Sequence, residues 1–155
     1  MEEKRRVNVR GIIWREGKIL AVKHKDPDGT ESSHWAVPGG GLDLLEWMEN
    51  GVKREIYEEL GVEAEVGRLL FMQQFNSKRH GFDEELELFF EVKDSPAYDA
   101  ITLETTSHGH HELARVEFVD PKEVLILPKV ISTFDFEAAL SSAPSLTLVN
   151  ELVNR

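Results

Sequence analysis

The chain of 155 residues is 41% hydrophobic and 30% charged, which fits one globular domain, and its lack of cysteine excludes disulfides and thiolate-bound metals. A formal net charge of −11 repels phosphates and disfavours binding to nucleic acid polymers. No apolar run approaches the ~20 residues of a membrane span, and the charged start lacks a signal-peptide core, so we expect a cytoplasmic protein with no membrane contact.

The first part of the chain is predicted to form a β-hairpin. Residues 7–14 (VNVRGIIW) and 18–22 (KILAV) are rich in β-forming side chains, and the turn Glu16-Gly17 joins them. The next segment, residues 26–34 (DPDGTESSH), has the proline, glycine and short polar residues of an irregular loop.

A helix is predicted over residues 46–60, after the glycine-rich segment 35–41 (WAVPGGG). Apolar side chains recur at every fourth position, at Met48, Val52, Ile56 and Leu60. Gly61 follows the last of them, where a C-terminal cap belongs.

Strands and polar loops are expected in the second half. Four runs have strand composition: residues 64–66, 69–75, 86–92 and 115–119. A polar loop covers residues 93–111, residues 120–123 begin a helical turn, residues 129–140 are predicted to be a full helix, and residues 141–155 a flexible tail. Mixed strands with two or three helices predict an α+β or α/β sandwich around a mixed sheet.

Three glutamates, Glu55, Glu58 and Glu59, share one face of the predicted helix. At ~100° per residue they fall within an arc of roughly 100°, beside the apolar stripe. Carboxylates so close repel one another, more strongly at the edge of a core. A divalent cation would relieve the repulsion, because Mg²⁺ takes oxygen ligands and joins carboxylates to substrate phosphates. Taken alone, such a cluster is more often a solvated acidic face than a metal site.

The glutamates belong to a longer spaced pattern that begins at Gly40. Five residues separate Gly40 from Glu46, seven more precede Arg54-Glu55-Ile56, and Glu58-Glu59 and Gly61-Val62 complete it. The pattern resembles the Nudix hydrolase signature GX5EX7REUXEEXGU, with U a bulky aliphatic residue, at every specified position. The resemblance covers residues 40–62 directly and implies a single Nudix domain over residues 1–155, an α/β/α sandwich around a mixed sheet.

The resemblance also implies roles for individual residues. The metal ligands would be the Gly39 carbonyl oxygen and the carboxylates of Glu55, Glu58 and Glu59. Arg54 would hold Glu46 and Glu55 by charged hydrogen bonds, and Glu46 would either reach the metal through water or support the loop. The implied reaction is Mg²⁺-dependent hydrolysis, with Mn²⁺ as a substitute, of the pyrophosphate linkage in a nucleoside diphosphate linked to another group. MutT-like hydrolysis of nucleoside triphosphates is the favoured branch.

The general base stays open at this level, because family members differ in it. Glu112 is placed first and Glu117 second, both around the last predicted strand. Glu84 and Glu85 lie further off, and Glu55 itself is a further candidate.

Basic residues occur in three short islands, Lys4-Arg5-Arg6, Lys23-His24-Lys25 and Lys78-Arg79-His80. Such islands are usually solvated surface. Lys23, at the end of the second strand, matches a position where similar proteins carry a basic residue that faces phosphate. We therefore expect Lys23 to bind substrate.

Several other features leave alternatives open. The segment 108–111 (HGHH) could hold a transition metal, contact substrate or form a plain surface loop. Phe75, Phe82 and Tyr98 could stack on a base, but core packing is the expectation for each.

The chain departs from the family pattern at Leu44-Leu45 and Trp47, where a Pro-Gly pair is common before the first glutamate. These apolar residues would pack on a partner subunit in a homodimer, on the base of a substrate, or on local core. One rival to an enzyme is a non-catalytic nucleotide-sensing domain on the same fold, and the full set of carboxylates argues against it, because a sensor need not retain every ligand. A second rival is an acidic Ca²⁺-binding or protein-interaction domain, which would leave the spacing of the glycine, glutamate and arginine residues unexplained.

Overall fold

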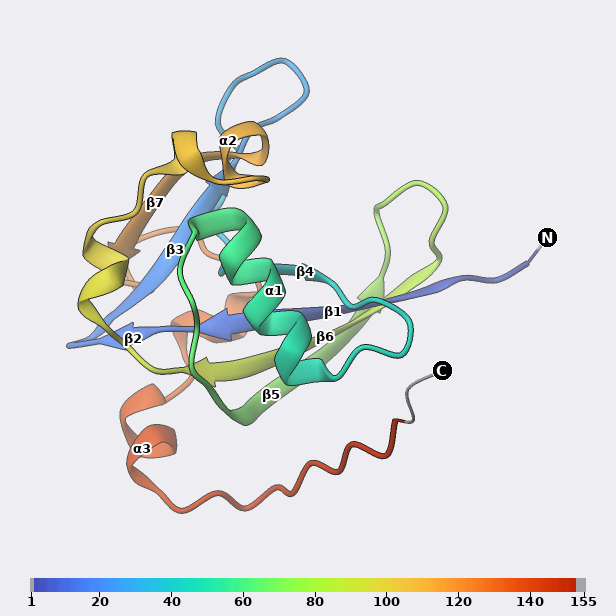
Figure 1. The fold of residues 1–155 in the computed structure, drawn as a ribbon, viewed down its shortest axis with the longest axis vertical. Helices are drawn as coiled ribbons and strands as arrows, with labels where there is room; N and C mark the ends of the chain where they lie inside the picture. The colour runs from blue at the N-terminus through green and yellow to red at the C-terminus, as the bar shows by residue number, and fades with distance from the viewer. Residues whose placement is uncertain (1, 153–155) are drawn as a thin grey trace.

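The computed structural model describes residues 2–152, and its strands form two sheets (Figure 1). The larger sheet has the order β4 (Gly39–Gly41), β1 (Arg5–Ile12), β6 (Glu84–Val92), β5 (Val66–Asn76). Strand β1 runs parallel to β6, whereas β4 and β5 run antiparallel to their neighbours, so the sheet is mixed. The smaller antiparallel sheet has the order β2 (Trp14–Arg15), β3 (Lys18–His24), β7 (Leu113–Val119).

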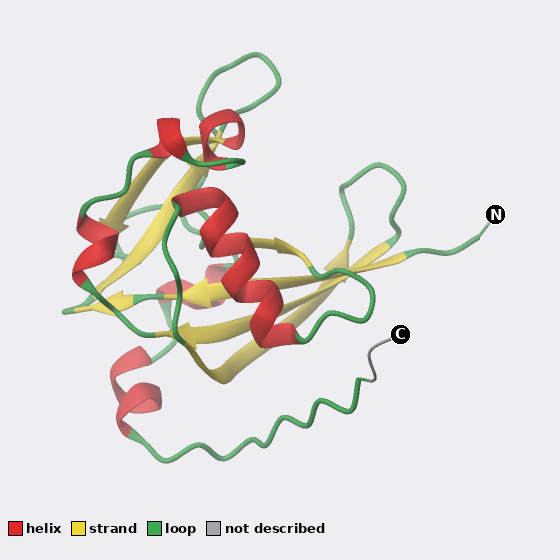
Figure 2. Ribbon diagram, viewed as in Figure 1, coloured by secondary structure: helices red, strands yellow, loops and turns green. Residues whose placement is uncertain are grey.

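Helices cover both faces of the larger sheet. Helix α1 (Met48–Leu60) lies across the strands on one face (Figure 2), and the short helices η3 (Lys129–Ser132) and α3 (Phe136–Ser141) pack on the other. The alternation of side chains along β6 divides the core, because neighbouring residues of a strand point to opposite faces. Phe90 belongs to the cluster beneath α1, and Phe89 belongs to the cluster that contains Phe136. The predicted α/β/α sandwich around a mixed sheet is confirmed.

Helix α1 forms where the spacing predicts it, and it starts at Met48 instead of residue 46. Its stripe side chains Val52, Ile56 and Leu60 are buried. Gly61 adopts the left-handed conformation, with φ 72°, and its N–H donates to the carbonyl of Tyr57. The predicted C-terminal cap is therefore present.

The predicted N-terminal hairpin is wrong in its first strand. The run 7–14 is divided at Ile13, and only Trp14 and Arg15 pair with the start of β3. The first part of the run becomes β1, which pairs with β6 and β4. The β-forming side chains of residues 7–14 suit a strand next to any neighbour, so their composition could not reveal that β6 and β4 are the partners of β1.

Several boundaries in the second half also differ from prediction. Residues 64–66 and 69–75 are not two strands, because β5 runs as one strand from Val66 to Asn76, with register irregularities near its start. The turn predicted over residues 120–123 is present, closed by a hydrogen bond from the Glu123 N–H to the Asp120 carbonyl at 3.0 Å, but it does not extend into a helix. The predicted loop 93–111 contains η1 (Pro96–Asp99), η2 (Leu103–Thr105) and the start of α2 (Gly109–Glu112).

The helix predicted over residues 129–140 is wrong, because η3 and α3 replace it. The Asp135 side chain accepts a hydrogen bond from the Ala138 N–H at 3.0 Å, so Asp135 caps a new helix instead of continuing the first. Beyond α3, residues 142–152 have no helix or strand, and residues 153–155 of the predicted tail lie outside the described residues. In the described part of the chain, no helix is long and apolar enough to cross a membrane.

Candidate active site

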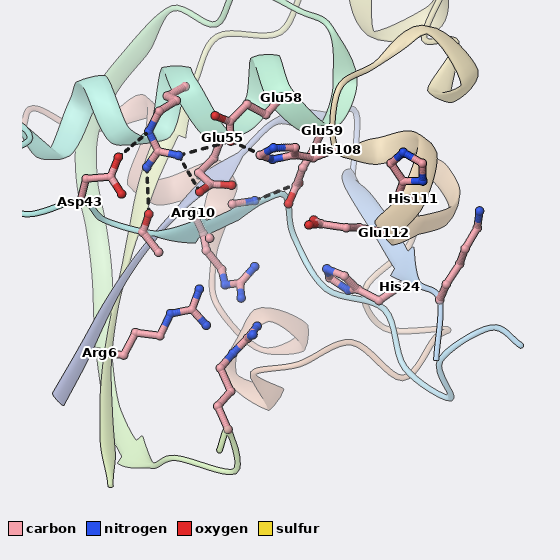
Figure 3. Close-up of a pocket in the computed structure, with 16 residues that line it drawn as sticks. Arg6, Arg10, His24, Asp43, Glu55, Glu58, Glu59, His108, His111 and Glu112 are labelled. Atoms are coloured by element: carbon pink, nitrogen blue, oxygen red, sulfur yellow. Dashed lines mark hydrogen bonds and ion pairs between the residues drawn. The ribbon is translucent and has the colours of Figure 1, made fainter. Parts of the chain in front are cut away.

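A cavity of about 680 Å³ lies beside the acidic face of α1 (Figure 3). Its other lining residues come from strands β1 and β4, the end of β3, helix α2 with His108 just before it, the loop before β6, and Asp43. Its volume is in the range of small-molecule sites.

The three glutamates of α1, Glu55, Glu58 and Glu59, line this cavity together with Gly39 and are called the box carboxylates below. Glu59 is only 2% exposed, and its Oε2 accepts a hydrogen bond from the Gly39 N–H at 3.3 Å. A Cβ atom on Gly40 would lie 2.7 Å from the Glu55 carboxylate. The glycine-rich strand β4 can therefore approach the helix closely enough to close the site.

Two of the box carboxylates, Glu55 and Glu59, lie in an environment that disfavours their negative charge. Burial raises the pKa of Glu59 to about 8, and the charges of Glu55 and Glu112 raise it further while Arg10 lowers it. Burial also raises the pKa of Glu55, against the opposing effect of Arg54. Carboxylates held in this way gain most from a bound cation.

Arg54 joins the loop to the helix. Its Nε and Nη2 donate to the two carboxylate oxygens of Glu46 at 2.8 and 2.9 Å, and its Nη1 donates to Glu55 Oε1 at 2.9 Å. A further bond runs from Nη2 to the Gly41 carbonyl at 2.9 Å. The bonds from Arg54 lower the pKa of Glu46 and keep it ionised. Glu46 does not line the cavity but contacts two residues that do, Arg54 and Asp43, whose backbone N–H donates to Glu46 Oε1 at 3.1 Å.

The donor atoms fit a hard divalent cation, since carboxylate and carbonyl oxygens are what Mg²⁺ and Mn²⁺ prefer. Within residues 2–152, no three acidic or imidazole side chains already form a metal-ligand group. Glu58 is held aside by Arg54 Nη1 at 3.3 Å and by His108 Nδ1 at 3.0 Å, and Glu59 bonds to Gly39. Repulsion between like charges keeps these carboxylates apart when no cation is bound. We therefore expect Glu58 and Glu59 to give up these hydrogen bonds and bind the metal when it is present.

Helix α2 carries Glu112 into the cavity. The His108 N–H donates to the Glu58 carbonyl at 2.9 Å, and Gly109 packs so tightly that a Cβ there would lie 2.0 Å from the Glu59 carbonyl oxygen. Glu112 therefore lies on the same cavity as the box carboxylates. Its charge contributes to the raised pKa values of Glu55 and Glu59.

The other candidates for the base lie elsewhere. Glu117 is exposed on β7 and pairs with Arg115 at 2.5 Å, outside the cavity. Glu84 pairs with Arg5, and Glu85 is buried behind the cavity wall, where Asn8 donates to it. Of the five candidates, Glu55 and Glu112 share the cavity.

Lys23 does not line the cavity. Its ammonium lies 5.4 Å from the centre of the Trp35 ring and 3.9 Å from a Glu31 carboxylate oxygen. The neighbouring Lys25 does line the cavity. A role for Lys23 in phosphate binding stays a prediction.

The three basic islands each contribute to the cavity, through Arg6, through His24 and Lys25, and through Arg79. Arg10 lines it too, although it belongs to no island. The sequence held one sign of this role, since Arg10 is the single charged residue in the β-rich run 7–14.

The HGHH segment (residues 108–111) lies beside the site, whereas the apolar residues Leu44, Leu45 and Trp47 are exposed to solvent. His108 bonds to Glu58 and His111 lines the cavity, so the segment adjoins the site. Leu44 is 89% exposed and therefore does not cover local core, and Leu45 and Trp47 are 42% and 46% exposed. Pairing of these residues with a second subunit stays a prediction.

The fold and the site together define an α/β/α protein in which a glycine-rich strand and an acidic helix form one wall of a charged cavity. A family model described as NUDIX domain matches residues 4–140, so the chain belongs to the Nudix family.

Individual relatives agree with this assignment. A MutT-like protein of Streptomyces ambofaciens is 34% identical over 119 residues, which cover 76% of this chain and 66% of the relative. Diphosphoinositol polyphosphate phosphohydrolase 3-alpha of Mus musculus is 39% identical over 66 residues, covering 42% of this chain and 37% of that protein. The crystal structure of a MutT NUDIX hydrolase from Burkholderia pseudomallei aligns with a TM-score of 0.64 and 25% identity, over 84% of this chain and 96% of that one. The chain spans only part of the two curated relatives.

Proposed function

We propose that this protein is a Nudix pyrophosphohydrolase that uses Mg²⁺, or Mn²⁺ as a substitute. Its substrate would be a nucleoside diphosphate linked to another group, with nucleoside triphosphates as the first candidates. The observation that supports this best is the convergence of the box carboxylates and Glu112 on one cavity. The similar Burkholderia pseudomallei protein is named a MutT NUDIX hydrolase, which agrees with this proposal.

In this proposal the metal is held by the Gly39 carbonyl oxygen and the box carboxylates. A bound divalent ion offsets negative charge on phosphate oxygens as it develops. Arg54 fixes Glu55 relative to the Glu46 loop, so that the ligands keep one arrangement. Glu112 accepts the proton of the attacking water on its carboxylate, with Glu55 as the alternative base. Lys23 is proposed to approach the substrate phosphates.

The test is a panel of nucleotides with millimolar Mg²⁺, in which released phosphate or pyrophosphate is measured. We expect turnover on at least one nucleotide, and Glu112→Gln should lower kcat by at least ~100-fold, within the range of general-base effects. Glu117→Gln is the matched control and should retain kcat within about twofold. A large loss in Glu117→Gln, with none in Glu112→Gln, would contradict the assignment of the base.

The rival proposal is a nucleotide-sensing domain without catalysis. It predicts that a nucleotide raises the melting temperature while no product forms in the presence of Mg²⁺ or Mn²⁺. Cytoplasmic location, homodimer formation and the lack of contact with nucleic acid or membrane also remain predictions. Gel filtration with light scattering would test the dimer.

A further inference from the structure

The cavity has a second wall made of three arginines, Arg6, Arg10 and Arg79, called the arginine wall below. Arg6 and Arg10 come from β1, and Arg79 comes from the loop between β5 and β6. Figure 3 shows Arg6 and Arg10 on the side of the cavity away from α1. The cavity is therefore acidic on one side and basic on the other.

The arginine wall is anchored from behind. Arg10 Nε donates to Glu87 Oε2 at 2.6 Å, and its Nη1 donates to the Val37 carbonyl at 3.0 Å. Glu87 is only 5% exposed, so Arg10 is held against a buried carboxylate. No hydrogen bond from Arg10 Nη2 occurs in the described part of the chain. That group is available to a ligand in the cavity.

Arg6 and Arg79 use fewer of their donors. They approach Glu85 at 4.0 and 3.8 Å, which is too long for hydrogen bonds. The oxygens of Glu85 accept instead from Asn8 at 2.9 Å and from Ser77 at 3.0 Å. Over residues 2–152, neither guanidinium donates a hydrogen bond to another residue. Two arginines therefore line the cavity with their donors unused.

The charges on this wall repel one another. Burial lowers the pKa of Arg6, and the charges of Arg79 and Arg10 lower it further. Among the described residues, none of the three arginines forms an ion pair with a box carboxylate across the cavity. The space between the walls therefore suits a ligand that is anionic where it meets the arginines, because guanidinium binds phosphate oxygens in a bidentate manner.

Among the described residues, the cavity lining offers no large aromatic ring on which a base could stack. Its described lining contains no Phe, Tyr or Trp side chain. Tyr98 is buried, with 5% exposure, and Phe75 and Phe82 also lie outside the lining. The cavity therefore offers charged contacts to phosphate but no large ring for a base to stack on.

We propose that the arginine wall binds phosphate beyond the scissile pyrophosphate, so that the enzyme selects substrates with three or more phosphates and tolerates different bases. This selection rests on the proposed hydrolase function and narrows it. Nucleoside tri- and tetraphosphates are the preferred class, over nucleoside diphosphates linked to an uncharged group.

Two substrate series test the proposal. In the first, ADP-ribose, ATP and adenosine tetraphosphate share one base: ADP-ribose carries an uncharged ribose where ATP carries a third phosphate, and adenosine tetraphosphate carries one phosphate more. In the second, ATP, GTP, CTP and UTP differ only in the nucleoside. We expect kcat/KM to rise at least about tenfold from ADP-ribose to ATP, because a charged contact contributes about 1.5–3 kcal/mol. Among the four bases, kcat/KM should vary less than about threefold.

Arg6→Gln and Arg79→Gln should each reduce the preference for ATP over ADP-ribose by at least about fivefold, mainly through a higher KM for ATP. Lys122→Gln removes a positive charge from an exposed turn outside the cavity and should leave the preference unchanged. Melting curves by circular dichroism show whether each variant is folded. If Arg6→Gln unfolds, Arg79→Gln decides the question, because the Arg79 side chain is 58% exposed.

Equal kcat/KM for ADP-ribose and ATP would overturn the proposal, as would arginine variants that lose activity equally on both. If wild type hydrolyses neither series, the proposed function fails, and calorimetry with inorganic tripolyphosphate at fixed free Mg²⁺ then tests the wall by itself. Binding that weakens at least about tenfold in Arg79→Gln supports the wall. Binding that is absent in wild type, or equal in the variant, refutes it.

Discussion

Arg54 binds Glu46 through two parallel hydrogen bonds, from Nε to Oε2 at 2.8 Å and from Nη2 to Oε1 at 2.9 Å. The same guanidinium donates to Glu55 at 2.9 Å through Nη1. A planar group with donors at fixed angles can meet both carboxylates at once, whereas an ammonium is a single point charge. The position of Glu55 in the cavity therefore depends on the shape of the Arg54 side chain as well as its charge.

Arg54→Lys should stay folded and lose at least about tenfold in kcat, with a smaller change in KM, because a loosely held Glu55 weakens contacts made in the transition state. Steady-state kinetics on the best nucleotide measure this. Arg68→Lys is the matched control, since Arg68 pairs with Glu91 outside the cavity. If kcat of Arg54→Lys lies within about twofold of wild type, the positioning role of Arg54 is wrong.

Local signals in the sequence were sufficient for α1 and for one wall of the cavity. The four-residue spacing of Val52, Ile56 and Leu60 set the buried face, and helical geometry alone then placed the box carboxylates together. Gly61 set the end of the helix by its backbone conformation. Such features depend on neighbours in the chain and can be predicted from them.

The opposite wall depends on distant pairings. Arg6 lies across from Glu85, and Asn8 from Glu87, only because β1 pairs in parallel with β6, nearly 80 residues later. Composition gave no reason to prefer that partner over the hairpin. The convergence of Arg6, Arg10 and Arg79 could therefore not be predicted, although two of them lay in basic islands that the sequence displays.

Metal should stabilise the folded protein. A ligand that binds only the native state adds RT ln(1 + [L]/Kd), about 2.7 kcal/mol at a hundredfold excess over Kd. We expect millimolar Mg²⁺ or Mn²⁺ to raise the melting temperature of wild type, and Glu59→Gln to abolish most of the rise. Glu117→Gln, outside the cavity, should respond like wild type. An unchanged midpoint of wild type at saturating metal would count against the ligand set.

Removal of one metal ligand should also stop turnover. Glu58→Gln and Glu59→Gln should each lower kcat by at least ~100-fold, because ligand charge supports the metal in the transition state. Near-normal turnover in both variants would refute the metal assignment. Without metal, Glu59→Gln should be at least as stable as wild type at neutral pH, since a neutral side chain can be buried without the proton uptake that burial imposes on Glu59.

Stability without metal should fall as the pH rises from about 4.5 to about 8. The pKa of Glu59 is raised from its ordinary value of 4.5 to about 8, so in this window the folded state binds a proton that the unfolded state has lost. Deprotonation therefore favours unfolding, and the loss is complete above the folded pKa. Urea unfolding in EDTA at several pH values measures the trend. Glu59→Gln should flatten it, and an equal slope in both proteins would assign the trend to other groups.

Gly109 should be required for the docking of α2 on α1. A Cβ at this position would lie 2.0 Å from the Glu59 carbonyl oxygen and 2.6 Å from Thr106 Oγ1, so alanine must displace α2 and the Glu112 that it carries. We expect Gly109→Ala to lower the free energy of unfolding by roughly 1–3 kcal/mol, as overpacking does, and to lower kcat with it.

Gly29→Ala is the control for the backbone cost of replacing a glycine. Gly29 has a positive φ of 84° and no atom within 4 Å of an added Cβ, so alanine there adds backbone strain of about 1 kcal/mol without a steric clash or loss of kcat. Urea unfolding and steady-state kinetics compare the two variants. A Gly109→Ala protein with wild-type kcat would show that Glu112 reaches the cavity without this contact, or that it takes no part in turnover.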